Sequence, residues 1–486
     1  MTAGRQPRLG VRMQEIANQV VDLLNGLIWG KILIWLLAGA GVYFTLRLGL
    51  IQIRHFGHVF SVLRGSRHGD SSGISSFQAL CTSLAARVGT GNIAGVAVAI
   101  TLGGPGAIFW MWVIALVGMA TAFVEATLAQ VFKIRDDKGQ FRGGPAYYME
   151  RGLGARWMGV LFSIFLIIAF GFVFNSVQAN TISGAMQGAF GIDTWITGVA
   201  VMLLTGLIIF GGLRSIARFS ELAVPFMAVA YLLMAVAVIL MNLGELPGVL
   251  ATIVKSAFGL EEAAAGGLGA AILNGFKRGL FSNEAGMGSA PNAAASATPY
   301  PPHPASQGYV QMAGVFIDTL LICTASAAII LLSGVPVGEA QGAALVQNAL
   351  TAEVGGWARY FLAVVILFFA FTSIVANYFY AENCLVFLEH NHPAGLLIFR
   401  LLVLAMVMFG SLASLPFVWN LADVSMGLMA ITNLVAILLL SRLALKLARD
   451  YNEQRKAGQL PTFDARHYPE IRGKIAPGIW EGDGKR

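Results

Sequence analysis

Charged side chains are scarce in this chain of 486 residues. Asp, Glu, Lys and Arg together make up 12% of it, whereas an average soluble domain contains about 25%. Hydrophobic residues make up 57%, and apolar runs long enough to cross a bilayer core of about 30 Å recur along nearly the whole length. The composition excludes a soluble globular protein and predicts a helical membrane protein with several spans.

Cysteine and histidine are also rare. Cys81, Cys323 and Cys384 lie far apart with no CxxC pair, and the seven histidines all fall outside the apolar runs. Neither a disulfide framework nor a zinc site is therefore indicated. The motif "EHNH" (389–392) has the residue types of a metal site, but a solvated turn before Pro393 is the simpler interpretation. An integral membrane enzyme is disfavoured, because its reacting groups would have to lie at membrane depth.

Eleven membrane spans are expected from the apolar runs. They cover roughly 26–46, 82–102, 106–132, 157–186, 195–212, 219–242, 264–288, 306–334, 358–388, 395–413 and 417–440. One set of alternate loops, with the C-terminal tail, holds 22 Lys and Arg residues, and the opposite set holds only Lys255. Because positively charged loops stay in the cytoplasm, the N-terminus is expected outside and the C-terminus inside a bacterial inner membrane. Arg5, Arg8 and Arg12 oppose this orientation, but the other loops outweigh them.

The net charge of +7 therefore lies along the inner membrane face, which indicates a lipid bilayer and no nucleic acid as partner. The spans divide into a leading helix and two sets of five, and an odd number makes the second set run inverted. We expect an interfacial segment at 1–25, the leading transmembrane helix at 26–46, a first five-helix repeat at 75–245 and a second at 262–442. A polar cytoplasmic tail is expected at 443–486, loosely ordered from about residue 450. A signal peptide cleaved near 38–41 is an alternative for the N-terminus, which Lys31 and the length of the apolar run oppose.

The first span of each set is interrupted by glycines and polar residues. The interruptions read "ARVGTGNIAGV" (86–96) and "NGFKRGLFSNEAGMGSAP" (274–291). An unwound helix leaves backbone groups that lipid cannot satisfy, at several kcal/mol each, so paired interruptions in inverted halves indicate a transporter's binding site. Freed amides favour an anion and freed carbonyls favour a cation. An amino acid zwitterion together with a sodium ion meets both requirements, and Gly89 and Gly91 permit the unwound backbone.

Three further stretches have expected places. "GGPG" (103–106) is typical of a tight outer hairpin, and "GGPAYYMERGLG" (143–154) is too long for a turn and predicts an inner helix or gate. Residues 248–260 and 339–353 are typical of outer amphipathic segments. All of them connect apolar spans.

The stretches "GTGNIAGVAVAITLGGPGAIFWMW" (89–112), "GGPAYYMERGLG" (143–154) and "GFKRGLFSNEAGMGSAP" (275–291) resemble the alanine/glycine:cation symporter family. The resemblance covers the chain to about residue 445. It implies an all-α polytopic membrane protein of about eleven transmembrane helices, with a leucine-transporter-type 5+5 inverted repeat and two broken helices. It also implies uptake of alanine or glycine with Na⁺ as the coupling ion and no organic cofactor.

The resemblance further implies two groups of site residues. The substrate would be held by the backbone N–H groups of Thr90, Gly91 and Asn92, by carbonyls around Asn274, Gly275, Phe276 and Lys277, and by Gln178 with Phe174 beside it. The ion would be held by the carbonyls of Ala85, Val88 and Phe369 and the hydroxyls of Thr372 and Ser373. Oxygen ligands without a carboxylate suit a monovalent cation better than Ca²⁺ or Mg²⁺.

Each polar residue also has a plainer interpretation. Thr372 and Ser373 could bond back to their own helix, and Gln178 could join helices together. Arg87, Lys277 and Arg278 could capture the substrate carboxylate, or form a gate with partners such as Glu284 or Glu125, and the gate is preferred.

Glu125, Asp318 and Asp423 are embedded acids that could relay a proton or serve in structural pairs. Coupling to protons instead of sodium therefore remains open as an alternative function. A passive channel is a poorer match, since the sequence has no continuous polar stripe.

Overall fold

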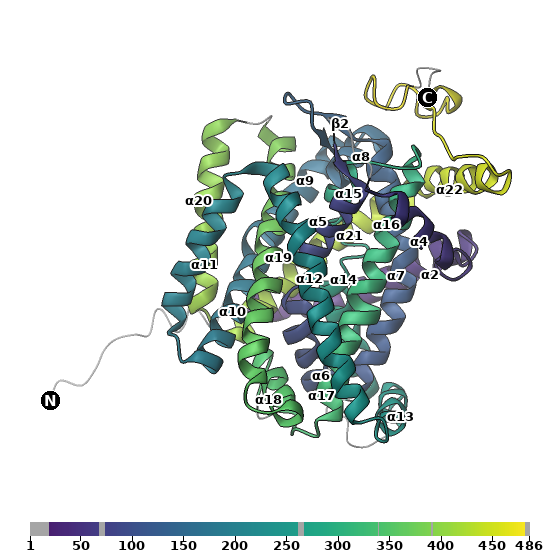
Figure 1. Cartoon of the computed structure of the whole chain (residues 1–486). Helices are drawn as coiled ribbons and strands as arrows, with labels where there is room; N and C mark the ends of the chain where they lie inside the picture. Colours follow the sequence, from purple (N-terminus) through teal and green to yellow (C-terminus); the bar gives the residue numbers. More distant parts are fainter. Residues whose placement is uncertain (1–18, 68–72, 261–266, 339, 390–391, 482–486) are drawn as a thin grey trace.

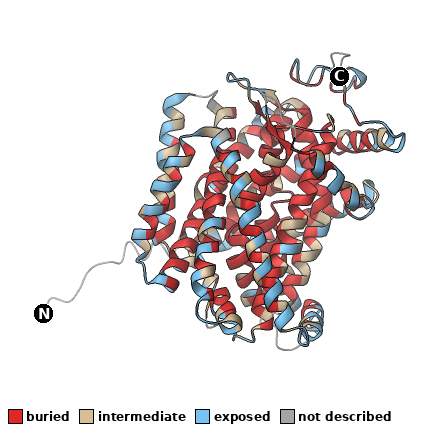
Figure 2. Ribbon diagram, in the orientation of Figure 1, coloured by how far each residue is buried: buried red, intermediate tan, exposed pale blue. Residues whose placement is uncertain are grey.

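The computed structural model describes residues 19–67, 73–260, 267–338, 340–389 and 392–481. In these residues, long helices run side by side in one bundle (Figure 1). Large apolar side chains on the outside of the bundle are mostly exposed, for example Leu207 (78% exposed) and Leu222 (80% exposed). Buried residues fill the middle of the bundle (Figure 2). An apolar outer surface of this kind requires hydrocarbon around it, which confirms the prediction of an integral membrane protein.

The first half of the described chain contains η1 (Ile28–Leu33), α2 (Ile34–Arg47), α3 (Ile51–Arg54), α4 (Phe56–Gly65), β1 (Ile74–Ser75), α5 (Ser76–Arg87), η2 (Gly91–Gly95), α6 (Val96–Gly103), α7 (Gly106–Val131), β2 (Ile134–Arg135), β3 (Phe141–Arg142), α8 (Pro145–Leu153), α9 (Arg156–Leu166), η3 (Ile167–Val173), α10 (Phe174–Phe190), α11 (Thr194–Ile209) and α12 (Gly212–Met241). The second half contains α13 (Leu246–Ala257), α14 (Gly267–Asn283), α15 (Pro291–Ala295), β4 (Ala297–Thr298), α16 (Pro304–Val315), η4 (Phe316–Cys323), α17 (Thr324–Leu332), α18 (Ala343–Val354), α19 (Ala358–Glu389), α20 (Pro393–Leu412), α21 (Leu415–Leu439), α22 (Ser441–Lys456) and η5 (Ala465–His467).

The helices follow the predicted spans closely. In the described residues, eight helices are long and apolar enough to cross a membrane, and the pair Ser76–Arg87 and Gly91–Gly103, bent by 51°, would make a ninth. The two other predicted spans are α11 with 16 residues and α14 with 17. The count of eleven spans and the inverted arrangement of two fives stay predictions.

A local motif sets where the first broken helix begins. The Ser75 hydroxyl accepts a hydrogen bond from the Gln78 amide (3.1 Å), and the Gln78 side chain accepts one from the Ser75 amide (3.1 Å). This capping box satisfies two backbone donors that a helix start leaves free. Immediately before it, β1 pairs in parallel with β4, so the start of α5 is tied to the chain that leaves the second break.

The connecting segments are also helical where this was expected. α8 lies at one end of the bundle, and α13 and α18 lie at the other (Figure 1). The turn between α6 and α7 contains Gly104 with a φ of 68°, a conformation that suits glycine. The predicted tight turn at 103–106 is therefore confirmed, and its position on the outer side of the membrane stays a prediction.

The prediction of a loosely ordered tail is wrong for the described residues up to 481. Tyr451 on α22 is fully buried, Phe463 and Tyr468 are nearly so, and the Trp480 indole donates to the carbonyl of Gln130 at 2.8 Å. The proline and charge content suggested disorder, but a few spaced aromatic residues bury enough apolar surface to anchor the segment to α7.

Candidate functional site

The first break lies where the glycine pattern placed it. α5 ends at Arg87, and Val88 leaves the helical region with φ −77° and ψ 80°. The Gly89 amide donates to the Asn92 side-chain oxygen at 3.0 Å, so a side chain replaces the missing helical acceptor. A Cβ at Gly89 would lie 2.3 Å from the Ser373 hydroxyl, which explains why this position needs glycine.

Oxygen atoms from two helices meet beside this break. The Ser373 hydroxyl on α19 lies 2.8 Å from the carbonyl of Ala85 and 3.0 Å from that of Phe369. The Thr372 hydroxyl lies 2.9 Å from the same Phe369 carbonyl. The structure thus brings four of the five oxygens expected at the ion site into one cluster, with Val88 fully buried at the adjoining end of α5.

Gln178 reaches the break from α10. Its side-chain oxygen accepts a hydrogen bond from the Thr90 amide at 3.0 Å. The Thr90 hydroxyl and the Trp419 indole N–H are buried, and neither has a partner among the described residues. Buried polar groups normally have partners, so each of these two atoms retains an unused hydrogen-bonding capacity near the first break.

The second break lies in the later part of the predicted interruption 274–291, but the backbone at 274–277 is not unwound, which corrects the expectation for the carbonyls there. α14 continues unbroken through Asn274–Lys277 to Asn283, so the carbonyls of those four residues lie inside a regular helix. The irregular segment is 284–290, with positive φ angles at Glu284 (58°), Gly286 (94°) and Gly288 (83°).

Polar side chains from other helices hold this second break. Glu125 on α7 accepts from the Gly286 amide at 3.1 Å, and Asn433 on α21 donates to the Gly286 carbonyl at 3.0 Å. Asn433 also contacts Glu125 and accepts from Tyr148 on α8. Glu125 therefore supports unwound backbone, as its structural interpretation proposed.

Three of the expected substrate residues on α14 face elsewhere. A Cβ at Gly275 would lie 2.5 Å from Trp110 on α7, the Phe276 ring lies 6.3 Å from the Trp110 ring, and Asn274 bonds back to Ala270. Close packing against α7 is what these residues provide. The part of α14 that contacts the first break is one turn further on, at Phe281 and Ser282.

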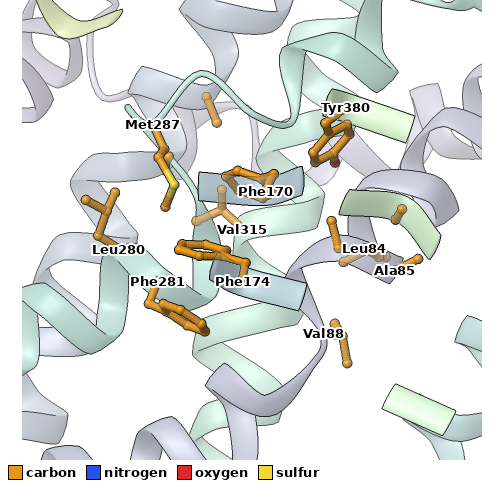
Figure 3. Packing of buried hydrophobic residues seen from close by; sticks show 14 of the residues in the cluster. Leu84, Ala85, Val88, Phe170, Phe174, Leu280, Phe281, Met287, Val315 and Tyr380 are labelled. Carbon is orange, nitrogen blue, oxygen red and sulfur yellow. The ribbon is translucent and has the colours of Figure 1, made fainter. Parts of the chain in front are cut away.

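Aromatic rings enclose the first break. A Cβ at Gly91 would lie 2.9 Å from the Phe281 ring, whose centroid is 4.5 Å from that of Phe174 and 4.7 Å from that of Trp419. Figure 3 shows Phe281 and Phe174 side by side, with Phe170 beyond them. Large, rigid side chains therefore pack directly against the unwound backbone.

The embedded cations differ in their partners. Lys277 lies 3.2 Å from Asp423 on α21, and Arg278 forms an ion pair with the same carboxylate while its guanidinium lies 4.6 Å from the Trp419 ring. These pairs favour the gate over capture of a substrate carboxylate. Arg87 has no carboxylate within 4 Å in the described residues, and it contacts the Gln311 carbonyl at 3.5 Å. Arg87 therefore forms no direct ion pair with Glu284 or Glu125, which were named as possible gate partners.

Asp318 on η4 occupies a different environment. It is fully buried and accepts hydrogen bonds from Ser282 (2.6 Å), Thr319 (2.7 Å) and the Asn92 side chain (2.7 Å). In the described part of the chain it has no basic partner within salt-bridge distance. Asn92 thus links this carboxyl group directly to the first break.

Sequence reasoning missed Phe281, Ser282 and Trp419. Single residues in apolar helices give no periodic signal, so only their contacts reveal them. The glycines at 286 and 288 after "SNE" (282–284) could have indicated the true second break, because two closely spaced glycines disfavour a helix there.

Side chains that could bind a metal ion do not cluster in the described residues. These residues contain no group of three or more His, Cys, Asp or Glu side chains able to hold a metal ion. Two members of the "EHNH" motif, His390 and Asn391, lie outside the described residues, so that motif is not tested.

A bundle of apolar helices with buried, unwound backbone at its centre defines an integral membrane transporter. The sequence model of the sodium:alanine symporter family matches residues 13–465, and the chain belongs to this family. Its members are symporters, so the chain is a transporter and not an enzyme.

Known relatives extend over almost the whole chain. An uncharacterized transporter of Escherichia coli is 52% identical, covering 95% of this chain and 98% of that protein. A probable sodium/glutamine symporter of Bacillus subtilis is 51% identical, covering 93% of this chain and 94% of that protein. A putative sodium/proton-dependent alanine carrier protein of the same bacterium is 42% identical, covering 95% of this chain and 97% of that protein. The fold is also similar to that of a manganese transporter of Eremococcus coleocola, with a TM-score of 0.54 at 14% identity over 75% of this chain and 78% of that one.

Proposed function

We propose that this chain imports alanine or glycine together with Na⁺ across the bacterial inner membrane by alternating access. The observation that carries the proposal is the contact of the Ser373 hydroxyl with the Ala85 carbonyl (2.8 Å) at the first break. Uncharged oxygens from two helices form a site for a monovalent cation. A cation there would hold α5 to α19 beside the proposed substrate site. The orientation with the N-terminus outside and the C-terminus inside, and the inverted arrangement of two five-helix repeats, belong to the same proposal.

The amide of Thr90 and the side chain of Gln178 are proposed to bind the substrate carboxylate. The Thr90 amide donates a hydrogen bond to the Gln178 side-chain oxygen. A substrate carboxylate would replace that oxygen as the acceptor and would also accept a hydrogen bond from the side-chain NH₂ group of Gln178. Gly91, Asn92 and the unpartnered Thr90 hydroxyl adjoin the same position. Phe174 and Phe281, whose ring centroids lie 4.5 Å apart in direct contact, form a wall beside this position that would exclude a large substrate side chain.

The ion and the substrate would stabilise each other, because both bind the same unwound segment, and this coupling is reciprocal. One Na⁺ moving inward contributes about 2.3 kcal/mol per 100 mV of membrane potential. The bundle that carries both breaks would then move against α19 and α21, with the Lys277, Arg278 and Asp423 cluster opening and closing as a gate.

Uptake into proteoliposomes tests this function. Purified protein is reconstituted, and labelled alanine uptake is measured with an inward Na⁺ gradient, with an inward proton gradient, and with neither. Uphill accumulation with the Na⁺ gradient alone supports the proposal. Competition by unlabelled glycine, serine and glutamine then ranks the substrates, and stronger competition by glutamine than by glycine would refute the small pocket.

A second candidate is coupling to protons, which one observation favours. Asp318 is fully buried beside Asn92 at the first break, and embedded carboxyl groups of this kind serve as proton relays in membrane transporters. If protons are coupled, the proton gradient alone drives accumulation, and Asp318→Asn abolishes it while Thr372→Ala with Ser373→Ala leaves it intact.

A further inference from the structure

A groove of about 760 Å³ lies behind α5, on the outside of the bundle. Its walls come from α4, α5, α12 and η4. Phe60, Val229 and Leu321 on its edges are 48%, 56% and 38% exposed, so the groove opens toward the surface that faces lipid. Its volume is many times that of one water molecule, which takes up about 30 Å³.

The lining of this groove is almost uniformly apolar. Apart from Arg64 and Arg67, every lining residue is aliphatic, aromatic, proline or cysteine. An amino acid zwitterion or a bare ion would lose its hydration there without replacement, so the groove is not suited to be their pathway. A hydrocarbon chain, by contrast, loses nothing on entering it.

The two arginines lie at the end of the groove nearest the membrane surface. Arg64 is in the last turn of α4 and Arg67 follows it, and both precede the span that begins at Ser76. Both are exposed, and Arg67 lies 5.1 Å from the ring of Phe77, another lining residue. Among the described residues, no carboxylate forms an ion pair with either one.

The nearby acid Glu221 on α12 does not line the groove. It accepts a hydrogen bond from the Gln78 side chain at 2.9 Å. Within the described part of the chain, the two guanidinium groups are thus not taken up by a carboxylate.

The depth of the groove matches one leaflet of a bilayer. It runs along α5 from Phe77 to Val88, which spans about 16 Å at 1.5 Å per residue. Half of a hydrocarbon core of about 30 Å is nearly the same length. A phosphate at the arginines would therefore place its acyl chain along the Leu80, Leu84 and Val88 face of α5.

We propose that this groove binds an anionic phospholipid, with its phosphate at Arg64 and Arg67 and one acyl chain along α5. Basic residues at the membrane-surface end of a pocket between transmembrane helices suit acidic lipid headgroups. The lipid packs on the face of α5 that carries Leu80, Leu84 and Val88, next to the face that carries Ala85, and it supports the half-helix that ends at the first break. Lipid binding itself does not depend on the proposed sodium site.

Native mass spectrometry of the delipidated full-length protein tests the proposal. The protein is titrated with dioleoyl phosphatidylglycerol and, separately, with dioleoyl phosphatidylcholine. One tightly bound phosphatidylglycerol per chain is expected, with at least tenfold weaker binding of phosphatidylcholine. Arg64→Gln with Arg67→Gln should weaken phosphatidylglycerol binding by about tenfold or more. Ala228→Trp, which fills the groove from α12, should abolish binding while both arginines remain.

Arg442→Gln with Arg449→Gln is the matched control, because it removes the same charge from exposed positions on α22, away from the groove. Melting temperatures confirm that each variant is folded, and Leu232→Trp replaces Ala228→Trp if the latter is not. Equal binding of both lipids, no saturable lipid, or the same loss in the α22 control would each overturn the proposal.

Discussion

Ser373 and Ala85 are 288 positions apart in the sequence, yet the Ser373 hydroxyl donates to the Ala85 carbonyl across 2.8 Å. α19 is continuous here and α5 is about to end, so the contact joins an intact helix to the rim of unwound backbone. Such a contact stabilises the break without a ligand, and the same two oxygen atoms could instead coordinate a cation.

Replacement of Ser373 by alanine removes one oxygen from this cluster. We expect the sodium concentration that gives half-maximal uptake to rise about tenfold, equivalent to ~1.4 kcal/mol, while the maximal rate at saturating sodium changes less. Sodium titration of alanine uptake measures this. Ser411→Ala is the control, because Ser411 is a buried serine that bonds back to its own helix, α20, at 3.1 Å. An equal shift in both variants would contradict the ion assignment.

Gln178→Ala removes the acceptor of the Thr90 amide and the proposed donor to the substrate carboxylate. The KM for alanine should rise by tenfold or more, since each lost hydrogen bond to a charged group is worth about 1.5–3 kcal/mol. The control is Gln187→Ala, an exposed position on the same helix, α10. An unchanged KM would show that Gln178 only joins helices.

Phe281→Ala should widen the space beside Gly91. The ratio of glutamine uptake to alanine uptake is expected to increase. A ratio is used because a buried Phe→Ala change also lowers the stability of the protein by about 3–5 kcal/mol, which reduces the uptake of both substrates alike. Phe399→Ala controls for that loss, because Phe399 is buried against Tyr378 with ring centroids 5.8 Å apart. If the uptake ratio stays constant, Phe281 does not bound the substrate.

Asp423→Asn leaves Lys277 and Arg278 without their common carboxylate. Removal of one partner from a buried ion pair costs about 3–5 kcal/mol, so the melting temperature and the uptake rate should both fall. A second change, Arg278→Gln, should restore part of the lost stability, because fewer unpaired charges then remain. A thermal double-mutant cycle measures the coupling, and strictly additive effects would argue against the gate cluster.

Acidification should loosen the packing of α22. The pKa of His55 and of His58 falls from 6.5 to about 4, because burial disfavours the charged ring and Arg455 lies nearby. His58 contacts the Tyr451 hydroxyl at 3.0 Å. A histidine with a lowered folded pKa stabilises the fold fully above pH 6.5, and this contribution is lost as the pH falls toward 4.

Hydrogen exchange of the α22 amides between pH 7 and pH 4, corrected for the intrinsic pH dependence of exchange, measures this loss. Protection should decline with acidification in the native protein and decline less in His58→Gln. His467→Gln, at an exposed site, serves as the control. Protection that is independent of pH would contradict the assignment.

Much of the fold could be predicted from the sequence, for identifiable reasons. Apolar runs specify spans because lipid tolerates little else, and the first break was found because Gly89 and Gly91 stand among apolar residues. The interruption 274–291 contains the second break, but the carbonyls at 274–277, which the resemblance implied as ligands, lie inside a helix in which Lys277 and Arg278 are paired. Their partner Asp423 is 145 or more positions away, and no local pattern reveals it.

The site was predicted less completely. Thr372 and Ser373 were found because the resemblance pointed to them, and both do contact helix carbonyls. Phe281 and Ser282 were overlooked, because their role depends on the direction in which α14 presents them to Gly91 and Asn92. The orientation of α14 is set by its packing against α7, and the sequence alone does not reveal this packing.

The central claim is that the oxygens at the first break bind sodium and couple it to the substrate. The most direct measurement is the alanine affinity of the purified protein as sodium replaces potassium at constant ionic strength, in the native chain and in the Thr372→Ala, Ser373→Ala double variant. Alanine should bind more tightly as sodium rises in the native chain, and the double variant should lose this dependence while still binding alanine weakly. An alanine affinity that ignores sodium in the native chain, or depends on it equally in both proteins, would contradict the account.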